Sequence, residues 1–146
     1  MSKTVPFDTT IEVRDTCLCL HAQRAARALA RRFDDALRPT GLTNQQFSLL
    51  MALNRPEPPT MAPVAQMLAM DRTTLTAALK PLERRGLLRI EPDPQDRRSR
   101  RIVLTEAGEA VLAQAVPIWR ETHKLVEAGL PGVDPDQLRT GLRILA

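Results

Sequence analysis

The sequence predicts a mainly α-helical fold that carries one small β-hairpin. Leucine and alanine, both strong helix formers, make up most of the apolar residues, whereas aromatic residues are 3% of the chain. Apolar residues recur at intervals of three and four over most of the 146 residues, which is the period of helices with one buried face. Residues 87–91 and 101–104 are short apolar runs on either side of a turn-rich segment, which is the pattern of a β-hairpin.

The first helix is expected to begin at Asp15 or Thr16, either of which can cap it, and to reach about Leu37. Pro39 and Gly41 then end it. One face of this helix is apolar, and its members are Ala22, Ala25, Ala26, Leu29, Phe33 and Leu37. Because the alanines are small, this face suits either the core or close packing against a second subunit.

Two shorter helices follow. Thr43 begins one of them, and Gln46 three residues later completes a capping box. The proline-rich segment 55–59 is too stiff to continue this helix. The next helix opens at Thr60, with Pro63 in its first turn, where a missing N–H is tolerated.

Asp71 is a strong N-cap for a fourth helix that runs towards Arg85 and ends at Gly86. Its inward positions are Leu75, Ala78, Leu79 and Leu82. About three residues separate this helix from the preceding one, so the pair indicates a helix-turn-helix. Pro81 predicts a kink, because it removes the hydrogen bond to the carbonyl group of Ala77.

The hairpin comes next, and four arginines lie near its tip between residues 97 and 101. Thr105 then starts a long helix to about Ala128, with a bend expected at Pro117. A final helix starts at Asp134 and places Leu138, Leu142 and Leu145 at helical spacing.

The net positive charge lies in one segment. Residues 71–101 hold nine basic and five acidic side chains, so this segment accounts for the formal charge of +4 of the whole chain. A cationic segment in an otherwise neutral chain indicates a polyanionic partner, and arginines at a hairpin tip suit contacts with phosphates along a duplex. A merely solvated basic surface is the alternative.

Other classes of protein are not expected. The chain shows no apolar leader and no run long enough to span a membrane, so we expect a cytosolic protein without a membrane partner. Its glycines are scattered and no nucleophile elbow is present, so neither an enzyme nor a cofactor is expected. Cys17, Cys19 and His21 do not share one helical face, which argues against a metal site.

Three segments together resemble the MarR family of bacterial transcription regulators. They are Met70-Asp-Arg-Thr-Thr-Leu-Thr-Ala-Ala-Leu-Lys-Pro-Leu-Glu-Arg-Arg-Gly-Leu-Leu, then Asp93-Pro-Gln-Asp-Arg-Arg-Ser with Leu104-Thr-Glu-Ala-Gly, and Gly41-Leu-Thr-Asn-Gln-Gln-Phe. The likeness covers about residues 15–145. It implies a homodimer that reads a pseudo-palindromic operator in double-stranded DNA, with half-sites about one helical turn apart.

The resemblance also implies a division of the chain. Residues 39–104 would form a winged helix-turn-helix DNA-binding domain, in which the hairpin is the wing. Residues 15–38 and 105–146 would form a helical dimerisation region, with the first helix and the last two pairing across a twofold axis. Residues 1–14 are expected to be a flexible N-terminal arm.

The candidate DNA contacts lie on the fourth helix and the wing. Arg72, Thr73, Thr74 and Thr76 are expected at base edges in the major groove, and Lys80 at a phosphate. Asp96 and Arg98 match the Asp-x-Arg of the family, which implies that the arginine enters the minor groove while the aspartate holds the tip. Phosphate contacts are expected from Arg97 and Arg100.

The resemblance places an effector pocket between the dimerisation helices and the winged domain. Its candidate lining residues are Arg24, Phe33, Phe47 and Trp119, and an arginine would suit an anionic aromatic ligand. The expected function is therefore a repressor that a small molecule releases from DNA.

Two alternatives stay open. One is a redox-sensing DNA-binding regulator that uses Cys19 or Cys17, since one branch of the family senses hydroperoxides with a cysteine near the start of the first helix. That branch supports its thiol with tyrosines, which this chain lacks. The other is a winged-helix adaptor whose wing meets an acidic protein.

Overall fold

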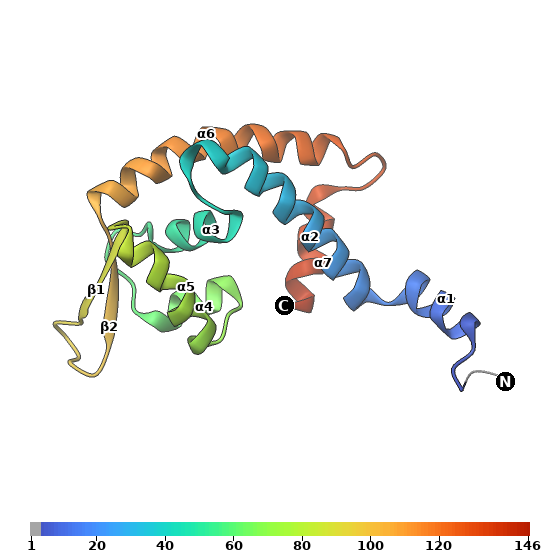
Figure 1. Cartoon of the computed structure of the whole chain (residues 1–146), viewed down its shortest axis with the longest axis horizontal. Coiled ribbons are helices and arrows are strands. Elements are labelled where there is room, and N and C mark those ends of the chain that lie inside the picture. The colour runs from blue at the N-terminus through green and yellow to red at the C-terminus, as the bar shows by residue number, and fades with distance from the viewer. Residues whose placement is uncertain (1–3) are drawn as a thin grey trace.

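The structure is a computed structural model that describes residues 4–146. These residues form seven α-helices, one 3₁₀ turn and a two-stranded antiparallel hairpin, which confirms the predicted fold class (Figure 1). In chain order the elements are α1 (Phe7–Thr16), α2 (Leu18–Leu37), η1 (Arg38–Thr40), α3 (Asn44–Leu53), α4 (Met61–Leu68), α5 (Arg72–Arg84), β1 (Leu88–Pro92), β2 (Arg100–Leu104), α6 (Glu106–Ala128) and α7 (Pro135–Leu145). Within the described range, no helix has the length and apolar character needed to cross a membrane.

The core lies where α3, α4 and α5 meet β2, the end of α2 and the first half of α6. Its fully buried large side chains are all aliphatic, namely Leu37, Leu49, Leu50, Val64, Leu75, Leu79, Leu82, Leu88 and Ile102. Burying each such side chain stabilises the fold by roughly 1.5–3 kcal/mol. This core fixes α5 and the hairpin relative to each other, because both elements contribute to it.

Helix caps set the boundaries of the helix-turn-helix as the sequence predicts. The Thr43 and Gln46 side chains form the expected capping box at α3. The Asp71 carboxylate accepts a hydrogen bond from the backbone N–H of Thr74 at 2.7 Å and so caps α5. Gly86 ends the turn after α5 with a φ of 73°, a left-handed conformation that favours glycine.

A compact junction joins α5, the hairpin and α6. The Thr105 hydroxyl donates a hydrogen bond to the carbonyl oxygen of Gly86 at 2.6 Å and accepts one from the N–H of Gly108 at 3.1 Å. The N–H of Thr105 donates to the carbonyl oxygen of Leu87 at 3.2 Å. Gly108 packs so closely here that a Cβ at this position would overlap the Leu87 carbonyl oxygen.

The N-terminal region differs from the expectation. Residues 7–16 form helix α1 instead of belonging to a flexible arm, while residues 1–3 of that arm lie outside the described range. Extended backbone at Cys17 separates α1 from α2, so Cys17 and not Asp15 or Thr16 is the N-cap of α2. The two predicted caps were wrong because both residues lie inside α1, where Asp15 pairs with Arg14.

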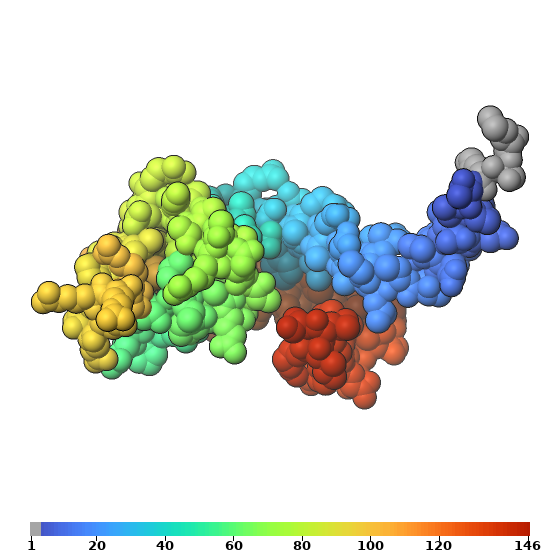
Figure 2. Space-filling model, turned by 90° about the horizontal axis from the view of Figure 1, so that it is seen from below, coloured from blue at the N-terminus to red at the C-terminus, as the bar shows by residue number. Residues whose placement is uncertain are grey.

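Several helices expose apolar side chains. The apolar face of α2 packs on the core at Leu37, but Leu29 nearer its N-terminus is 41% exposed. Helices α1 and α7 contribute no buried residue. Helix α1 projects from the end of the molecule opposite the hairpin (Figures 1 and 2).

Candidate nucleic-acid interface

The exposed face of α5 carries the residues predicted to read DNA. Leu75, Leu79 and Leu82 anchor the opposite face in the core. All five predicted contacts are therefore exposed to solvent, namely Arg72, Thr73, Thr74, Thr76 and Lys80. The Thr76 hydroxyl donates to the carbonyl oxygen of Arg72 at 2.8 Å, which fixes the side chain and leaves its methyl group free for contact.

Two charged residues, Asp71 and Arg72, stand at the N-terminus of α5. Hydrogen bonds from Thr74 lower the pKa of the Asp71 carboxyl below its usual range. The charged Asp71 caps the first turn, and it also offsets part of the positive potential at this helix end. Arg72, the next residue, adds an exposed positive charge at the same end of the helix.

Backbone hydrogen bonds hold the tip of the wing. The Asp96 carboxylate accepts from the N–H of Arg98 at 3.0 Å, and the Asp96 carbonyl oxygen accepts from the N–H of Ser99 at 2.9 Å. The Asp93 carboxylate accepts from the N–H of Gln95 at 3.0 Å in the same way. Asp96 thus shapes the turn that presents Arg98, through the backbone and without an ion pair to a neighbouring arginine.

An ion-pair cluster that sequence reasoning missed braces the base of the wing. Glu91 pairs with Arg89 at 3.1 Å and with Arg101, and these two arginines hold the pKa of the Glu91 carboxyl below its usual range, Arg101 having the larger effect. The strand register places Glu91 directly opposite Arg101. The signal was present in the sequence, since Arg89 and Glu91 share one strand face and the hairpin pairing sets Arg101 across from them.

The structure brings part of the predicted site together in one hollow of about 340 Å³ between α5 and the wing. We call it the reading groove; its charged and hydroxyl-bearing lining residues are Arg72, Thr76, Arg98, Ser99 and Arg100. Figure 2 shows α5 and the hairpin side by side on one face. Thr73, Thr74, Lys80 and Arg97 are exposed nearby but do not line the groove.

The arginines of this surface are available to a ligand. Within residues 4–146, no ion pair involves Arg72, Arg97, Arg98 or Arg100. Four guanidinium groups without internal partners, on a rigid helix and a braced wing, form a surface that favours a polyanion.

Comparisons with known proteins bear on this arrangement. A sequence model of the MarR family matches residues 40–99, which span the helix-turn-helix and most of the wing. The organic hydroperoxide resistance transcriptional regulator of Bacillus subtilis is 31% identical over 128 residues, which is 88% of this chain and 86% of that protein. The chain belongs to the MarR family. Regulators of this family are DNA-binding proteins and not enzymes.

Solved structures of MarR-family proteins share the fold. The M. tuberculosis transcriptional regulator MosR in complex with DNA is 40% identical and superposes with a TM-score of 0.81, over 89% of this chain and 93% of that one. Bordetella bronchiseptica BpsR, whose DNA binding is regulated by 6-hydroxynicotinic acid, is 25% identical with a TM-score of 0.71, over 88% and 89% of the two chains. Three other curated regulators match over only 52 to 57% of their length, so the chain spans about half of those relatives.

The candidate effector residues are only partly brought together. Phe47 and Trp119 stack with ring centroids 6.2 Å apart, and both line a hollow of about 440 Å³ between α3, α4 and α6. We call this hollow the effector pocket, because it contains two of the four residues that were expected to bind an effector. Phe33 packs against the core and does not line the effector pocket.

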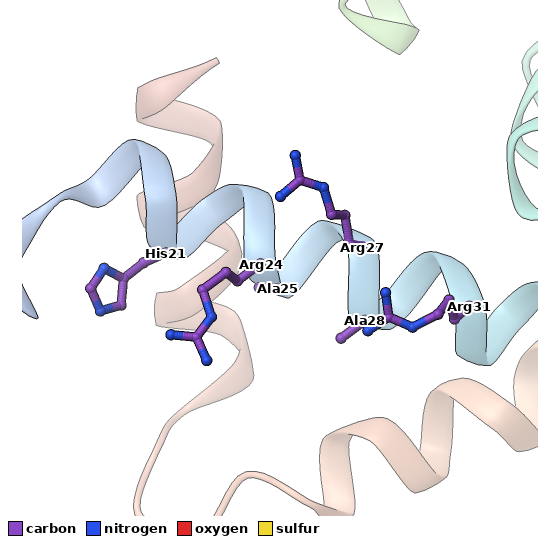
Figure 3. A pocket seen from close by; sticks show the side chains of 6 residues that line it. All are labelled: His21, Arg24, Ala25, Arg27, Ala28 and Arg31. Atoms are coloured by element: carbon purple, nitrogen blue, oxygen red, sulfur yellow. The ribbon is translucent and has the colours of Figure 1, made fainter. Parts of the chain in front are cut away.

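The placement of Arg24 with these aromatic residues is not supported. Arg24 lines a separate hollow on α2 (Figure 3). The N-terminal half of that helix extends away from the core (Figure 1), and Leu37 at its other end is its only buried residue. The effector pocket instead has Arg120 in its wall, a residue that sequence reasoning missed. No signal in the sequence indicated it, because the place of Arg120 in this wall depends on how α6 packs against α3 and α4.

The contacts of the two thiols do not favour the redox alternative. The Cys17 sulfur accepts a hydrogen bond from the N–H of Leu20 at 3.4 Å and so caps α2. The Cys19 sulfur accepts one from the Gln23 amide at 3.0 Å. Neither contact involves a cation, and both serve the local structure of α2.

No cluster of three or more metal-ligating side chains occurs in the described part of the chain.

Proposed function

We propose that this chain binds a pseudo-palindromic DNA operator as a homodimer and represses transcription until a small anionic aromatic molecule releases it. One observation carries the proposal. Arg72 and Thr76 on α5 and Arg98 and Arg100 on the wing line the same groove, and the three arginines form no ion pair with any of residues 4–146. A helix and an adjoining basic hairpin in this arrangement suit one turn of a duplex.

Each part of the surface has a distinct role in this proposal. The first turn of α5 enters the major groove, where Arg72 pairs bidentately with guanine and the Thr76 methyl meets a thymine methyl. Arg98 enters the adjacent minor groove, whose negative potential is highest in A·T-rich sequence. Lys80 and Arg100 contact phosphates, which position the protein without specifying sequence.

The exposed apolar residues support the dimer. Many of them lie on α2, the end of α6 and α7, where Leu125 is 51% and Leu142 is 50% exposed. Apolar side chains on three neighbouring helices are characteristic of a surface that a partner covers. A twofold axis through this region directs two copies of α5 towards successive major grooves.

The effector pocket supports ligand control. It lies between α6, which belongs to the dimerisation region, and α3 and α4 of the winged domain. Phe47 and Trp119 offer ring faces for stacking, and Arg120 offers a bidentate partner for a carboxylate. The regulation of BpsR by 6-hydroxynicotinic acid makes an aromatic acid the first ligand class to test.

The choice between repression and activation is inferred from the names of related regulators. One of the partially matching regulators, from Pseudomonas putida, is named a transcriptional repressor, and another, from Rhodopseudomonas palustris, a transcriptional activatory protein. Repression is the simpler proposal, because a dimer that covers an operator excludes polymerase without further contacts.

Selection of bound duplexes from a random pool, followed by gel shifts, tests the proposal. The selected site is expected to be a palindrome with half-sites about 10 base pairs apart. Six or more phosphate contacts predict that affinity falls by about 10³-fold or more between roughly 50 and 200 mM salt. Arg98→Ala should weaken binding, whereas Arg38→Ala, which removes another exposed arginine outside the groove, should not. Failure to shift any duplex at low salt, with binding to an acidic protein instead, would leave the adaptor function in its place.

A further inference from the structure

Helix α1 carries a row of three carboxylates that neither the proposed DNA contacts nor the effector pocket uses. Asp8, Glu12 and Asp15 follow one another at intervals of four and three residues, which places them on one side of the helix. All three are exposed. Within the described residues, Asp8 and Glu12 take part in no ion pair, while Asp15 pairs only with its neighbour Arg14. We call these residues the carboxylate row.

Helix α2 carries a row of opposite charge. Arg24, Arg27 and Arg31 follow at intervals of three and four residues and surround a hollow of about 540 Å³ (Figure 3). The hollow also contains Ala25 and Ala28, whose small side chains leave room for another element to approach. No carboxylate among residues 4–146 pairs with any of these three arginines. We call them the arginine row.

The two rows match in length and in register when the helices run antiparallel. The first and last residues of each row are seven positions apart, which is about 10.5 Å along the helix. Read in opposite directions, Asp8 meets Arg31, Glu12 meets Arg27 and Asp15 meets Arg24, with spacings of four and then three on both helices. If the helices were parallel, the intervals of four and three on α1 would face intervals of three and four on α2. The central residues, Glu12 and Arg27, would then lie one residue out of register.

The rows cannot meet within one chain. Helix α1 ends at Thr16 and α2 begins at Leu18, so Cys17 alone connects them. Reversing the chain between two antiparallel helices takes a loop of about two to five residues. In the structure α1 accordingly extends away from α2 and leaves the carboxylate row open to solvent (Figure 1).

We infer that α1 of one protomer docks antiparallel on the arginine row of α2 in a second copy of this chain. This inference rests on the homodimer of the proposed function and adds to it a specific contact that twofold symmetry forms twice. Charge complementarity identifies the occupant of each row. The arginine row shares helix α2 with the exposed apolar residues Leu18 and Leu29, which belong to the surface proposed for dimerisation.

Reciprocal charge reversal tests this contact. Sedimentation velocity at about 50 mM salt gives the dimer dissociation constant of each full-length variant. Asp8→Lys with Glu12→Lys is expected to raise that constant about tenfold, and Arg27→Glu with Arg31→Glu should do the same. All four changes together should return it to within about threefold of the parent. Arg32→Glu with Arg38→Glu makes the same charge change on or next to α2 outside the row, and it should not rescue the α1 variant.

Crosslinking gives a readout that does not depend on affinity. In a background of Cys17→Ser and Cys19→Ser, a chain with Glu12→Cys is mixed with a differently tagged chain carrying Arg27→Cys. A short bis-maleimide should join the two tags, and replacing Arg27→Cys by Arg38→Cys should abolish the product.

The outcomes separate this contact from the wider proposal. A parent that dimerises and shifts duplex DNA while the fourfold variant stays as weak as either double variant overturns the α1–α2 contact alone. Loss of DNA affinity with an unchanged dimer constant in the Arg27→Glu, Arg31→Glu variant also overturns it, and assigns the arginine row to phosphates. A parent that is monomeric at micromolar concentration overturns both the contact and the homodimer.

Discussion

Replacing Gly108 by alanine is expected to destabilise the protein, although alanine is the better helix former. The added Cβ would overlap the carbonyl oxygen of Leu87 and lie 2.8 Å from Cδ1 of Leu104. The Leu87 carbonyl is backbone and already accepts the N–H of Thr105 at 3.2 Å, so relief of the overlap must move the chain at the junction of the wing and α6.

The magnitude follows from two opposing effects. Alanine in place of glycine inside a helix gains about 1 kcal/mol. Overpacking against backbone costs about 3 kcal/mol, the upper end of the usual range. The net loss of about 2 kcal/mol lowers the melting temperature by roughly 4–8 °C for a chain of this size.

Urea unfolding and thermal melts at one fixed protein concentration measure this change, because dimerisation makes stability depend on concentration. Gly141→Ala in α7 is the matched substitution, because a Cβ there would meet no atom of residues 4–146 within 4 Å apart from the backbone of its own helix. It should gain about 1 kcal/mol, and a loss there would mean that a partner packs on that side of α7. A Gly108→Ala protein as stable as the parent would refute the close packing of the junction.

Three further predictions concern the wing, the DNA contacts and the effector pocket. Glu91→Gln should lower the melting temperature at pH 7 and have a smaller effect at pH 3. The pKa of the Glu91 carboxyl is lowered in the folded protein, so the charged group stabilises the fold above its unfolded-state pKa of 4.5, and this stabilisation is lost as the pH falls through the folded-state pKa. An equal change in melting temperature at both pH values would contradict the ion-pair cluster. In gel shifts, Arg98→Ala should lose affinity mainly on operators with A·T-rich flanks, whereas Lys80→Ala should lose it equally on all sequences, and identical profiles would reject the separate groove and phosphate roles. Trp119 is the only tryptophan, so 6-hydroxynicotinic acid should change its fluorescence; Arg120→Ala should weaken that binding about tenfold, and an unchanged titration would remove the arginine from the pocket.

Local chemistry made the helix-turn-helix predictable from the sequence. Thr43 and Asp71 cap their helices because a short polar side chain can reach the free N–H groups of the first turn, and this depends only on neighbours in the chain. The hairpin was predictable for the same reason, since its strands and turn are contiguous. The kink at Pro81 stays a prediction.

Contacts between distant segments were harder to foresee. Asp34 accepts hydrogen bonds from the N–H and the side-chain amide of Asn44, at 2.7 and 2.8 Å, and so ties α2 to the start of α3. Its carboxyl pKa is lowered by these bonds. Nothing in the spacing of the two residues indicates this contact, because it depends on the turn that η1 makes between the helices. The position of Arg120 likewise depends on how α6 packs against α3.

Three hydrogen bonds of Thr105 couple the orientation of α6 to that of the elements around the reading groove. The end of α5, the first strand of the wing and the first turn of α6 are pinned to one another there, so they tilt as a single block when α6 tilts. In the proposed dimer, a molecule that binds between α6 and α3 would therefore release DNA by tilting α6 slightly, because the two copies of α5 would then no longer match the spacing of successive major grooves.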